Sequence, residues 1–160
     1  MKLITFIICS LFVFNSMLAN AELKGGYLIS KEEAALPDMH ALDKQVNRGH
    51  SIQADRKEAS GPIILIEKPK EDKFYSDLID ILVKFEKNPM GVAVNMESVR
   101  VIYLKAFGID ITDRLQSYIK GNQIDAHGVK FPEGDHKFEI RVKDQDQVES
   151  SKIISIHVAS

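Results

Sequence analysis

The segment "FGIDITDRLQSYIK" (residues 107–120) holds the densest group of side chains suited to binding a ligand or a partner. Asp110, Asp113, Arg114 and Tyr118 follow one another closely in an otherwise strand-rich sequence. Two carboxylates, a guanidinium and a phenol at this spacing offer both signs of charge and a stacking surface. We therefore take these four residues as candidate binding residues, and none of them as catalytic.

The same segment also has a structural explanation, which we favour, as a connection between two strands. Thr112 or Asp113 is suited to cap a short helix, and Asp113 and Gln116 stand at the spacing of a capping box. One apolar stripe of that helix would lie on a sheet edge, and it consists of Leu115, Tyr118 and Ile119. Asp110 and Arg114 are then left either to pair with each other or to face a ligand.

Other polar clusters favour structural roles over metal binding. Asp144 and Asp146 have the spacing of some calcium ligands, but calcium needs about six to eight oxygens, and no second acidic cluster stands at a recognisable spacing. A turn in which Asp144 accepts hydrogen bonds from its own backbone is favoured. The five histidines form no H-x-x-x-H or H-x-H pair, and they are His40, His50, His127, His136 and His157. We expect no metal and no cofactor.

The first 21 residues have the pattern of a secretory signal peptide. Lys2 supplies a positive charge, residues 3–14 ("LITFIICSLFVF") are apolar, and residues 19–21 ("ANA") suit a signal peptidase. This pattern predicts export, with Glu22 as the first residue of the mature chain. The apolar run is shorter than the about 20 residues of a membrane-spanning helix, so we expect no stable membrane insertion after cleavage.

Composition narrows the function classes further. Removal of residues 1–21 takes away Lys2 and the single cysteine, Cys9, and leaves 139 residues. A mature chain without cysteine excludes disulfide scaffolds, thiol nucleophiles and zinc–thiolate sites. Its 20 basic and 23 acidic residues give a net charge of −3, which is too balanced to predict binding to nucleic acid.

We interpret residues 22–61 as an N-terminal arm or linker, because they carry few large apolar residues. Within this arm, Ser30 and Glu33 form a capping box for a short helix that a proline ends. Residues 26–30 ("GYLIS") are apolar enough to dock as an edge strand, on their own domain or on a neighbour. Residues 38–60 have weak periodicity, and we expect them to become ordered only by docking.

Residues 62–160 form a second unit, in which the hydrophobic pattern has a period of two. Five strands are predicted, over residues 62–67, 78–86, 98–107, 136–144 and 152–160. The expected core consists of Ile79, Ile81, Val83, Phe85, Val101, Phe138, Ile140, Val142, Ile154 and Ile156. Strict alternation is typical of antiparallel sheets with one face in water. The pattern predicts an all-β fold, an antiparallel β-sandwich with one short helix in a crossover.

Several of these segments together resemble bacterial immunoglobulin-like domains. They are "GPIILIEKP" at the entry, "VNMESVRVIYLKAFGIDITDRL" in the middle and "FPEGDHKFEIRVKDQDQVES" before the last strand. The last of them is similar to the hairpin "lPaGxHxxxvxvxDxxG" of such domains. The resemblance extends to small secreted proteins of Gram-negative bacteria that carry this domain behind a "YLISKEEAALP"-like arm. It implies an immunoglobulin-like sandwich, with a departure at Gln147, where a glycine is usual, and without the cysteines and tryptophan of antibody domains.

Together these features favour a non-catalytic module of the cell envelope, periplasmic or secreted. We expect this module to bind an envelope protein or to support an assembly, because the sequence shows an export signal and no nucleophile constellation. The alternative is a protein that binds a small ligand or a glycan at the edge around Asp110–Tyr118. That alternative requires a concave patch at this edge.

Overall fold

The computed structural model describes residues 26–39, 61–70, 72–76 and 78–159. The expected signal peptide (residues 1–21) and nearly all of the expected linker over residues 38–60 lie outside the described residues. Within the described part of the chain, no helix is long and apolar enough to cross a membrane.

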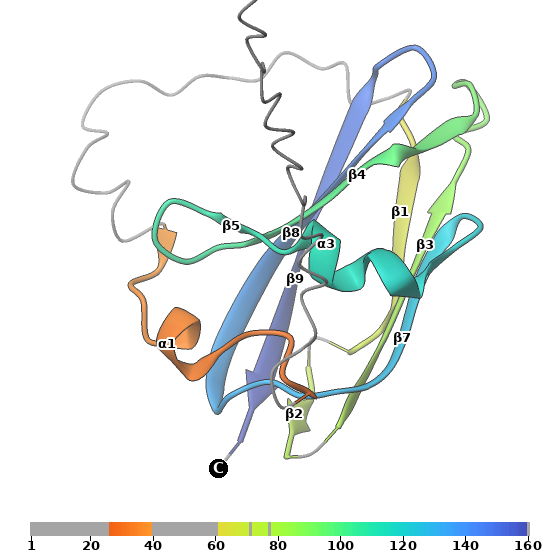
Figure 1. Cartoon of the computed structure of the whole chain (residues 1–160). Coiled ribbons are helices and arrows are strands. Elements are labelled where there is room, and N and C mark those ends of the chain that lie inside the picture. Colours follow the sequence, from red (N-terminus) through yellow and green to blue (C-terminus); the bar gives the residue numbers. More distant parts are fainter. Residues whose placement is uncertain (1–25, 40–60, 71, 77, 160) are drawn as a thin grey trace, which may run out of the picture.

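The first sheet has four antiparallel strands in the order β1-β3-β7-β6. The strands are β1 (Ile63–Lys68), β3 (Ile79–Glu86), β7 (Gln123–Val129) and β6 (Ile119–Lys120). In β3 every second residue is buried, as the alternation of isoleucine and valine with polar residues predicts. This sheet forms one layer of the molecule (Figure 1).

The second sheet has five strands in the order β2-β9-β8-β4-β5. The strands are β2 (Phe74–Tyr75), β9 (Glu149–Val158), β8 (Gly134–Asp144), β4 (Val94–Tyr103) and β5 (Ile109–Asp110). All neighbours are antiparallel except β2 and β9, which run parallel. The chain is therefore an all-β protein with two sheets, as the sequence predicts.

The core lies between the two sheets. All ten residues that the alternation places inside are buried, from Ile79 in β3 to Ile156 in β9. The intervening side chains of β8 point outward, and Lys137 is exposed. The register predicted for these strands is confirmed.

The strands differ from the prediction in their bounds and in their number, since β2, β5, β6 and β7 were not predicted. The strand expected over residues 98–107 is β4, which begins earlier, at Val94, and ends at Tyr103. It ends there because Ala106 has a left-handed backbone (φ 51°) and the Lys105 amide bonds back to the Tyr103 carbonyl at 2.9 Å. The sequence also gave no sign of β7, whose alternation is interrupted by a bulge: Ile79 pairs with Val129, but Ile81 pairs with Ala126.

The β8–β9 turn is held by Asp144, as predicted. Its Oδ1 accepts the backbone amides of Asp146 and Val148, both at 2.9 Å. The Gln147 amide donates to the Asp144 carbonyl at 3.1 Å, and Gln147 has φ 64°. Gln147 therefore occupies the left-handed position that favours glycine in this kind of turn.

The described part of the arm, residues 26–39, lies along one side of the sandwich (Figure 1, orange). Helix α1 (Lys31–Ala34) has the predicted capping box, in which Ser30 and Glu33 exchange side-chain-to-backbone hydrogen bonds. Leu28 and Ile29 are buried and belong to the core cluster of the sandwich. Residues 26–30 dock on their own domain, but their strand-like pairing is limited to one bridge between Tyr27 and Lys130, and they form no strand there.

Candidate functional site

The segment between β5 and β6 is helical, as expected, but its cap is different. It contains α3 (Thr112–Leu115) and a 3₁₀ turn, η2 (Gln116–Tyr118), and carries the chain from the second sheet to the first. The prediction that Thr112 or Asp113 caps the helix is wrong, because the N-cap is Ile111, which has no side-chain cap. The stripe prediction is right for burial, because Leu115 is buried and Tyr118 and Ile119 pack against the core. It is wrong for the element, because Ile119 belongs to β6 and not to the helix.

Asp110 and Thr112 fasten this segment to the sheet. The Asp110 Oδ1 accepts the Thr112 amide at 2.9 Å, and the Thr112 Oγ1 accepts the Val101 amide at 2.9 Å. The buried hydroxyl of Thr112 is thus turned back to β4, where it satisfies an edge amide. Asp110 is exposed but already has a structural partner in the backbone of its own turn.

Arg114 does not pair with Asp110; it holds the arm. Its Nη2 lies 2.6 Å from the Glu33 Oε1, and its Nη1 donates to the Glu33 Oε2 and to the Leu28 carbonyl, both at 2.9 Å. The hydrogen bond from Arg114 lowers the pKa of Glu33, against the opposing effect of partial burial. Two-point pairing between a guanidinium and a carboxylate is geometrically specific. Arg114 therefore connects α3 to α1 and to the chain before it.

The four candidate residues of this stretch thus differ in their surroundings. Arg114 is engaged by the arm, Asp110 by the Thr112 amide, and Tyr118 is half-buried against the core. Asp113 is exposed in the first turn of α3. The four residues belong to three different elements, β5, α3 and η2, and Asp110 and Arg114 have different hydrogen-bond partners.

A hollow of about 290 Å³ does lie beside this helix. Its lining combines the middle of β4 with the helical segment and the start of β6, and consists of Met96, Glu97, Val99, Arg100, Thr112, Gln116 and Ile119. The Arg100 Nη1 already donates to the carbonyls of Glu97 and Val99, at 3.1 and 2.7 Å. Its remaining N–H groups, together with the Gln116 amide, supply polar contacts at this hollow.

A larger groove, of about 560 Å³, lies between the arm and one end of the sandwich. We call it the arm groove. The arm, the β7–β8 connection and the end of β9 line it, with Tyr27, Lys31, Ala34, Ala35, Ser76, Phe131, Pro132, Glu133, Val158 and Ala159. Most of these side chains are apolar or small, and Lys31 and Glu133 add one charge of each sign. The volume falls in the range of ligand-binding clefts, about 300–1,000 Å³.

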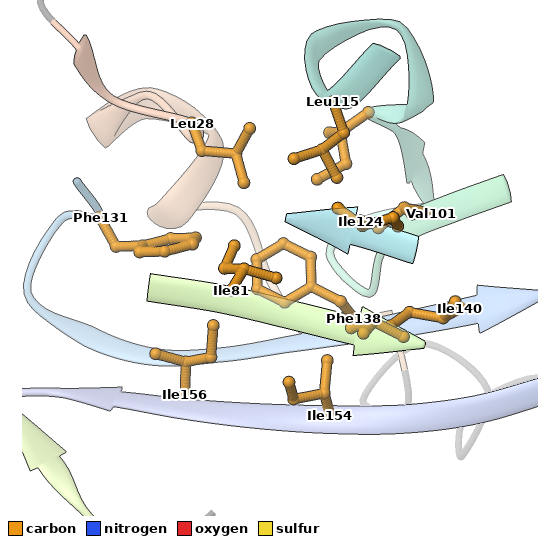
Figure 2. A pocket seen from close by; sticks show the side chains of 12 residues that line it. Leu28, Ile81, Val101, Leu115, Ile124, Phe131, Phe138, Ile140, Ile154 and Ile156 are labelled. Atoms are coloured by element: carbon orange, nitrogen blue, oxygen red, sulfur yellow. The ribbon is translucent and has the colours of Figure 1, made fainter. Parts of the chain in front are cut away.

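The interior holds a further small cavity, which is apolar on all sides. Its volume is about 20 Å³, and its walls include Ile81 of β3, Phe138 of β8 and Ile154 of β9. Figure 2 shows Leu28 of the arm and Leu115 of α3 also pointing into this space, from outside the two sheets. A cavity of this size and lining is a packing defect of the core rather than a binding site.

Two histidines lie beside carboxylates, each with a partner on a neighbouring strand. The His157 Nδ1 lies 2.7 Å from Asp135, its partner on β8, and Phe74 packs against its ring at 5.5 Å. His127 lies between Asp80 and Asp125 at 3.4 and 3.1 Å, one on each ring nitrogen. In the described part of the chain, no three metal-ligating side chains converge on one point.

The sequence alone does not predict the arm groove, although two of the segments that line it stand out in the sequence. The segment "GYLIS" and the motif "FPEGDH" contribute Tyr27 and residues 131–133. They stand about a hundred residues apart in the chain, and no periodicity connects them. Comparison of the chain with protein-family models, with curated proteins and with solved structures finds no match.

Proposed function

We propose that the protein is a non-catalytic, immunoglobulin-like module of the cell envelope that binds a segment of another envelope protein in the arm groove. The groove is the observation that carries this proposal. Its volume of about 560 Å³ has room for several side chains, its surface is partly apolar and partly polar, and Lys31 and Glu133 offer a bound segment one charge of each sign. Clefts that combine apolar side chains with a few placed polar groups are typical of ligand and peptide recognition.

The strand order supports the immunoglobulin-like part of this proposal. In immunoglobulin domains, strands A, B, E and D form one sheet, and strands C, F and G form the other. Here β1-β3-β7-β6 would be A-B-E-D, and β9-β8-β4 would be G-F-C. The short β5 beside β4 would then be C′, as in variable-type domains.

Photocrosslinking tests the groove directly. A benzoylphenylalanine at position 27 replaces an aromatic residue that is 37% exposed, whereas one at position 137 replaces the exposed Lys137 on the outer face of β8. We expect a protein adduct from position 27 in intact cells, and none from position 137. Lys31→Glu, a charge reversal in the groove, should weaken the adduct. Equal adducts from both positions, or none from position 27, would contradict the proposal.

Export is the second part of the proposal, and the pattern of residues 1–21 supports it. Intact-mass analysis of the protein from the periplasm or the medium should show Glu22 as its first residue. A protein that retains Met1 and stays with the cytoplasmic fraction would contradict export. It would not contradict binding in the arm groove.

A second candidate function, binding of a small ligand or a glycan, is favoured by the hollow of about 290 Å³ beside α3. Glu97, Arg100 and Gln116 are its exposed polar groups. If this hollow is the site, Arg100→Ala and Gln116→Ala should abolish binding of sugars or small polar ligands in saturation-transfer NMR, while Lys31→Glu should not. Binding that none of these changes affects would exclude the hollow.

A further inference from the structure

The most completely enclosed polar contact in the described chain is the pair of His136 and Tyr103. The exposed fractions are 1% for His136 and 0% for Tyr103. The His136 Nδ1 lies 2.8 Å from the Tyr103 hydroxyl, and its Nε2 lies 2.8 Å from the Pro132 carbonyl. Aromatic rings surround the pair, with Phe131 at 5.6 Å from the histidine ring and Phe138 stacked on Tyr103 at 4.9 Å.

These contacts determine the protonation state of the ring. The Pro132 carbonyl can only accept, so Nε2 carries a hydrogen and donates it. The neutral ring then accepts at Nδ1, and the Tyr103 hydroxyl is the donor. A proton added to Nδ1 would reverse this 2.8 Å hydrogen bond: the Tyr103 hydroxyl would have to accept it, and its own hydrogen would lose its acceptor. It would also place a positive charge in an apolar interior.

The neighbouring charges do not compensate for this burial. Burial lowers the pKa of His136 below 6.5, and the positive charge of Lys105 adds to this effect. The Pro132 carbonyl and Asp135 act in the opposite direction, but more weakly than burial. Burial also raises the pKa of Tyr103 to about 12, so its hydroxyl remains a neutral donor.

The two partners of His136 belong to the two segments that hold the arm. Pro132 stands two residues after Lys130, whose carbonyl accepts the Leu28 amide at 3.0 Å. Tyr103 directly precedes Leu104, whose carbonyl accepts the Met39 amide at 3.1 Å.

The charges of the arm lie at the same place. Asp38 bonds Lys105 at 2.7 Å, and the negative charges of Asp38 and Glu33 both reach Tyr103 and raise its pKa. His136 thus connects the attachment points of the two ends of the described arm.

We propose that His136 is a proton-sensitive pin, which holds residues 26–39 on the sandwich when it is neutral and releases them when it is protonated. The unfolded or released form binds a proton near pH 6.5, and the closed form resists it, so closure weakens as the pH falls through 6.5. One proton changes the closing equilibrium by up to about tenfold per pH unit. Because Tyr27 and Lys31 line the arm groove, release also dismantles that groove. The pin itself does not depend on the proposed partner.

Amide hydrogen exchange of the full mature chain tests the pin. Protection factors, corrected for the intrinsic effect of pH, are compared between about pH 7.5 and about pH 5. The reporters in the arm are the amides of Leu28 and Met39. The reference lies in the two sheets, which we call the body: it is the Phe85 amide, which donates to the Asn122 carbonyl at 2.8 Å. We expect the protection factors of the arm amides to fall at least about tenfold at the lower pH, while the protection factor of the Phe85 amide stays unchanged.

His136→Gln is the matched variant, because its amide can donate to Pro132 and accept from Tyr103 without titrating. We expect it to abolish the pH dependence of the arm. His157→Gln, at an exposed histidine bonded to Asp135, should leave that dependence intact.

Several results would overturn the pin. These are an unchanged arm at the lower pH, an equal loss of protection at Phe85, and a pH effect that persists in His136→Gln or disappears in His157→Gln. If His136→Gln does not fold, NMR titration of the wild-type imidazole decides: its midpoint must coincide with the loss of arm protection, and a different midpoint overturns the proposal.

Discussion

The arm and the β8–β9 hairpin lie on the same sandwich, but they are held by different kinds of contact. β8 and β9 pair over ten residues without interruption, and their inward side chains fill the core. The arm has two isolated bridges to the body, two fully buried side chains, Leu28 and Ile29, and two ion pairs. The hairpin is thus stabilised by a continuous series of backbone pairs and core contacts, and the arm by a few separate points of attachment.

This difference determines how each region should respond to substitutions that remove one of its contacts. In the hairpin, buried neighbours share one core, so losing one of them weakens the whole body. In the arm, each contact is a large fraction of what keeps it in place, and we expect the body to survive its release. The arm is therefore the better place for a regulated movement, since elements that move come from the less stable part of a fold.

The largest effect is expected for Phe138→Ala in β8. Phe138 is buried, stacks on Tyr103 at 4.9 Å and contacts Phe131 at 5.8 Å. Its removal should lower the free energy of unfolding by about 3–5 kcal/mol. Lys137→Ala, at the next and exposed residue, should change it by less than about 0.5 kcal/mol. Urea denaturation measures both, and similar losses would mean that the register of β8 is wrong.

Leu28→Ala should come next, and its effect should be local. The side chain fills space between the sheets (Figure 2), and a buried Leu→Ala change removes about 2–5 kcal/mol. The loss of body stability cannot exceed what docking of the arm contributes, so we expect the lower end of this range. Hydrogen exchange should show the Met39 amide losing protection while Phe85 keeps it.

Leu36→Ala is the control for this variant, because Leu36 belongs to the same arm but is 38% exposed. It should leave both amides unchanged. If Leu28→Ala weakens Phe85 as much as Met39, the arm and the body form one cooperative unit, and the comparison fails.

A smaller loss is expected for Arg114→Ala, which removes both the Glu33 pair and the bond to the Leu28 carbonyl. Hydrogen bonds to charged groups contribute about 1.5–3 kcal/mol, and the partial exposure of this pair places the loss near the lower end. Because the pKa of Glu33 is lowered in the folded chain, this contribution is present above its ordinary value of 4.5 and is lost as the pH falls below it.

A double-mutant cycle with Glu33→Ala measures the pair itself by thermal denaturation at neutral pH. Arg141→Ala is the control, since its pair with Glu139 lies within one strand and involves a guanidinium that is 43% exposed. It should cost no more than about 1 kcal/mol. An Arg114→Ala variant as stable as this control would restore Arg114 to the candidate binding residues.

The sequence predicts the body well because one physical rule acts along each long strand. In β3 and β8 one face is in the core and the other in water, so the alternation of residues such as Ile79, Asp80 and Ile81 can be read without knowing the partner strand. The rule fails for β7, where the bulge near Gly128 breaks the period.

The candidate site was harder to predict because its contacts are not local. Leu28 and Ile29 are consecutive and both buried, which breaks the strand period, and the apolar run around them is too short to show a helical one. Arg114 finds its partner Glu33 at a separation of 81 residues. Its nearest oppositely charged neighbours in the sequence, Asp110 and Asp113, are not the residues it pairs with. Charge pairing read from sequence neighbours therefore failed here.

The smallest effects on stability are expected for two residues with strained backbones, one in the hairpin and one under the arm. Gln147 and Ala106 have φ 64° and φ 51°, a conformation that costs a residue with a side chain about 1 kcal/mol relative to glycine. Gln147 lies in the β8–β9 turn. Gln147→Gly should raise the free energy of unfolding by about 0.5–1 kcal/mol, once the cost of the entropy that glycine adds to the unfolded chain is subtracted.

Ala106 donates its amide to the Pro37 carbonyl at 2.7 Å, so the arm shares in fixing its strained conformation. Ala106→Gly relieves the same strain but also loosens the segment on which the arm rests. We therefore expect a gain in body stability no larger than that of Gln147→Gly, together with a lower protection factor at Met39. An Ala106→Gly variant that protects Met39 as well as the wild type does would show that the arm is held independently of this turn, and would leave Leu28, Ile29 and Arg114 as its main attachments.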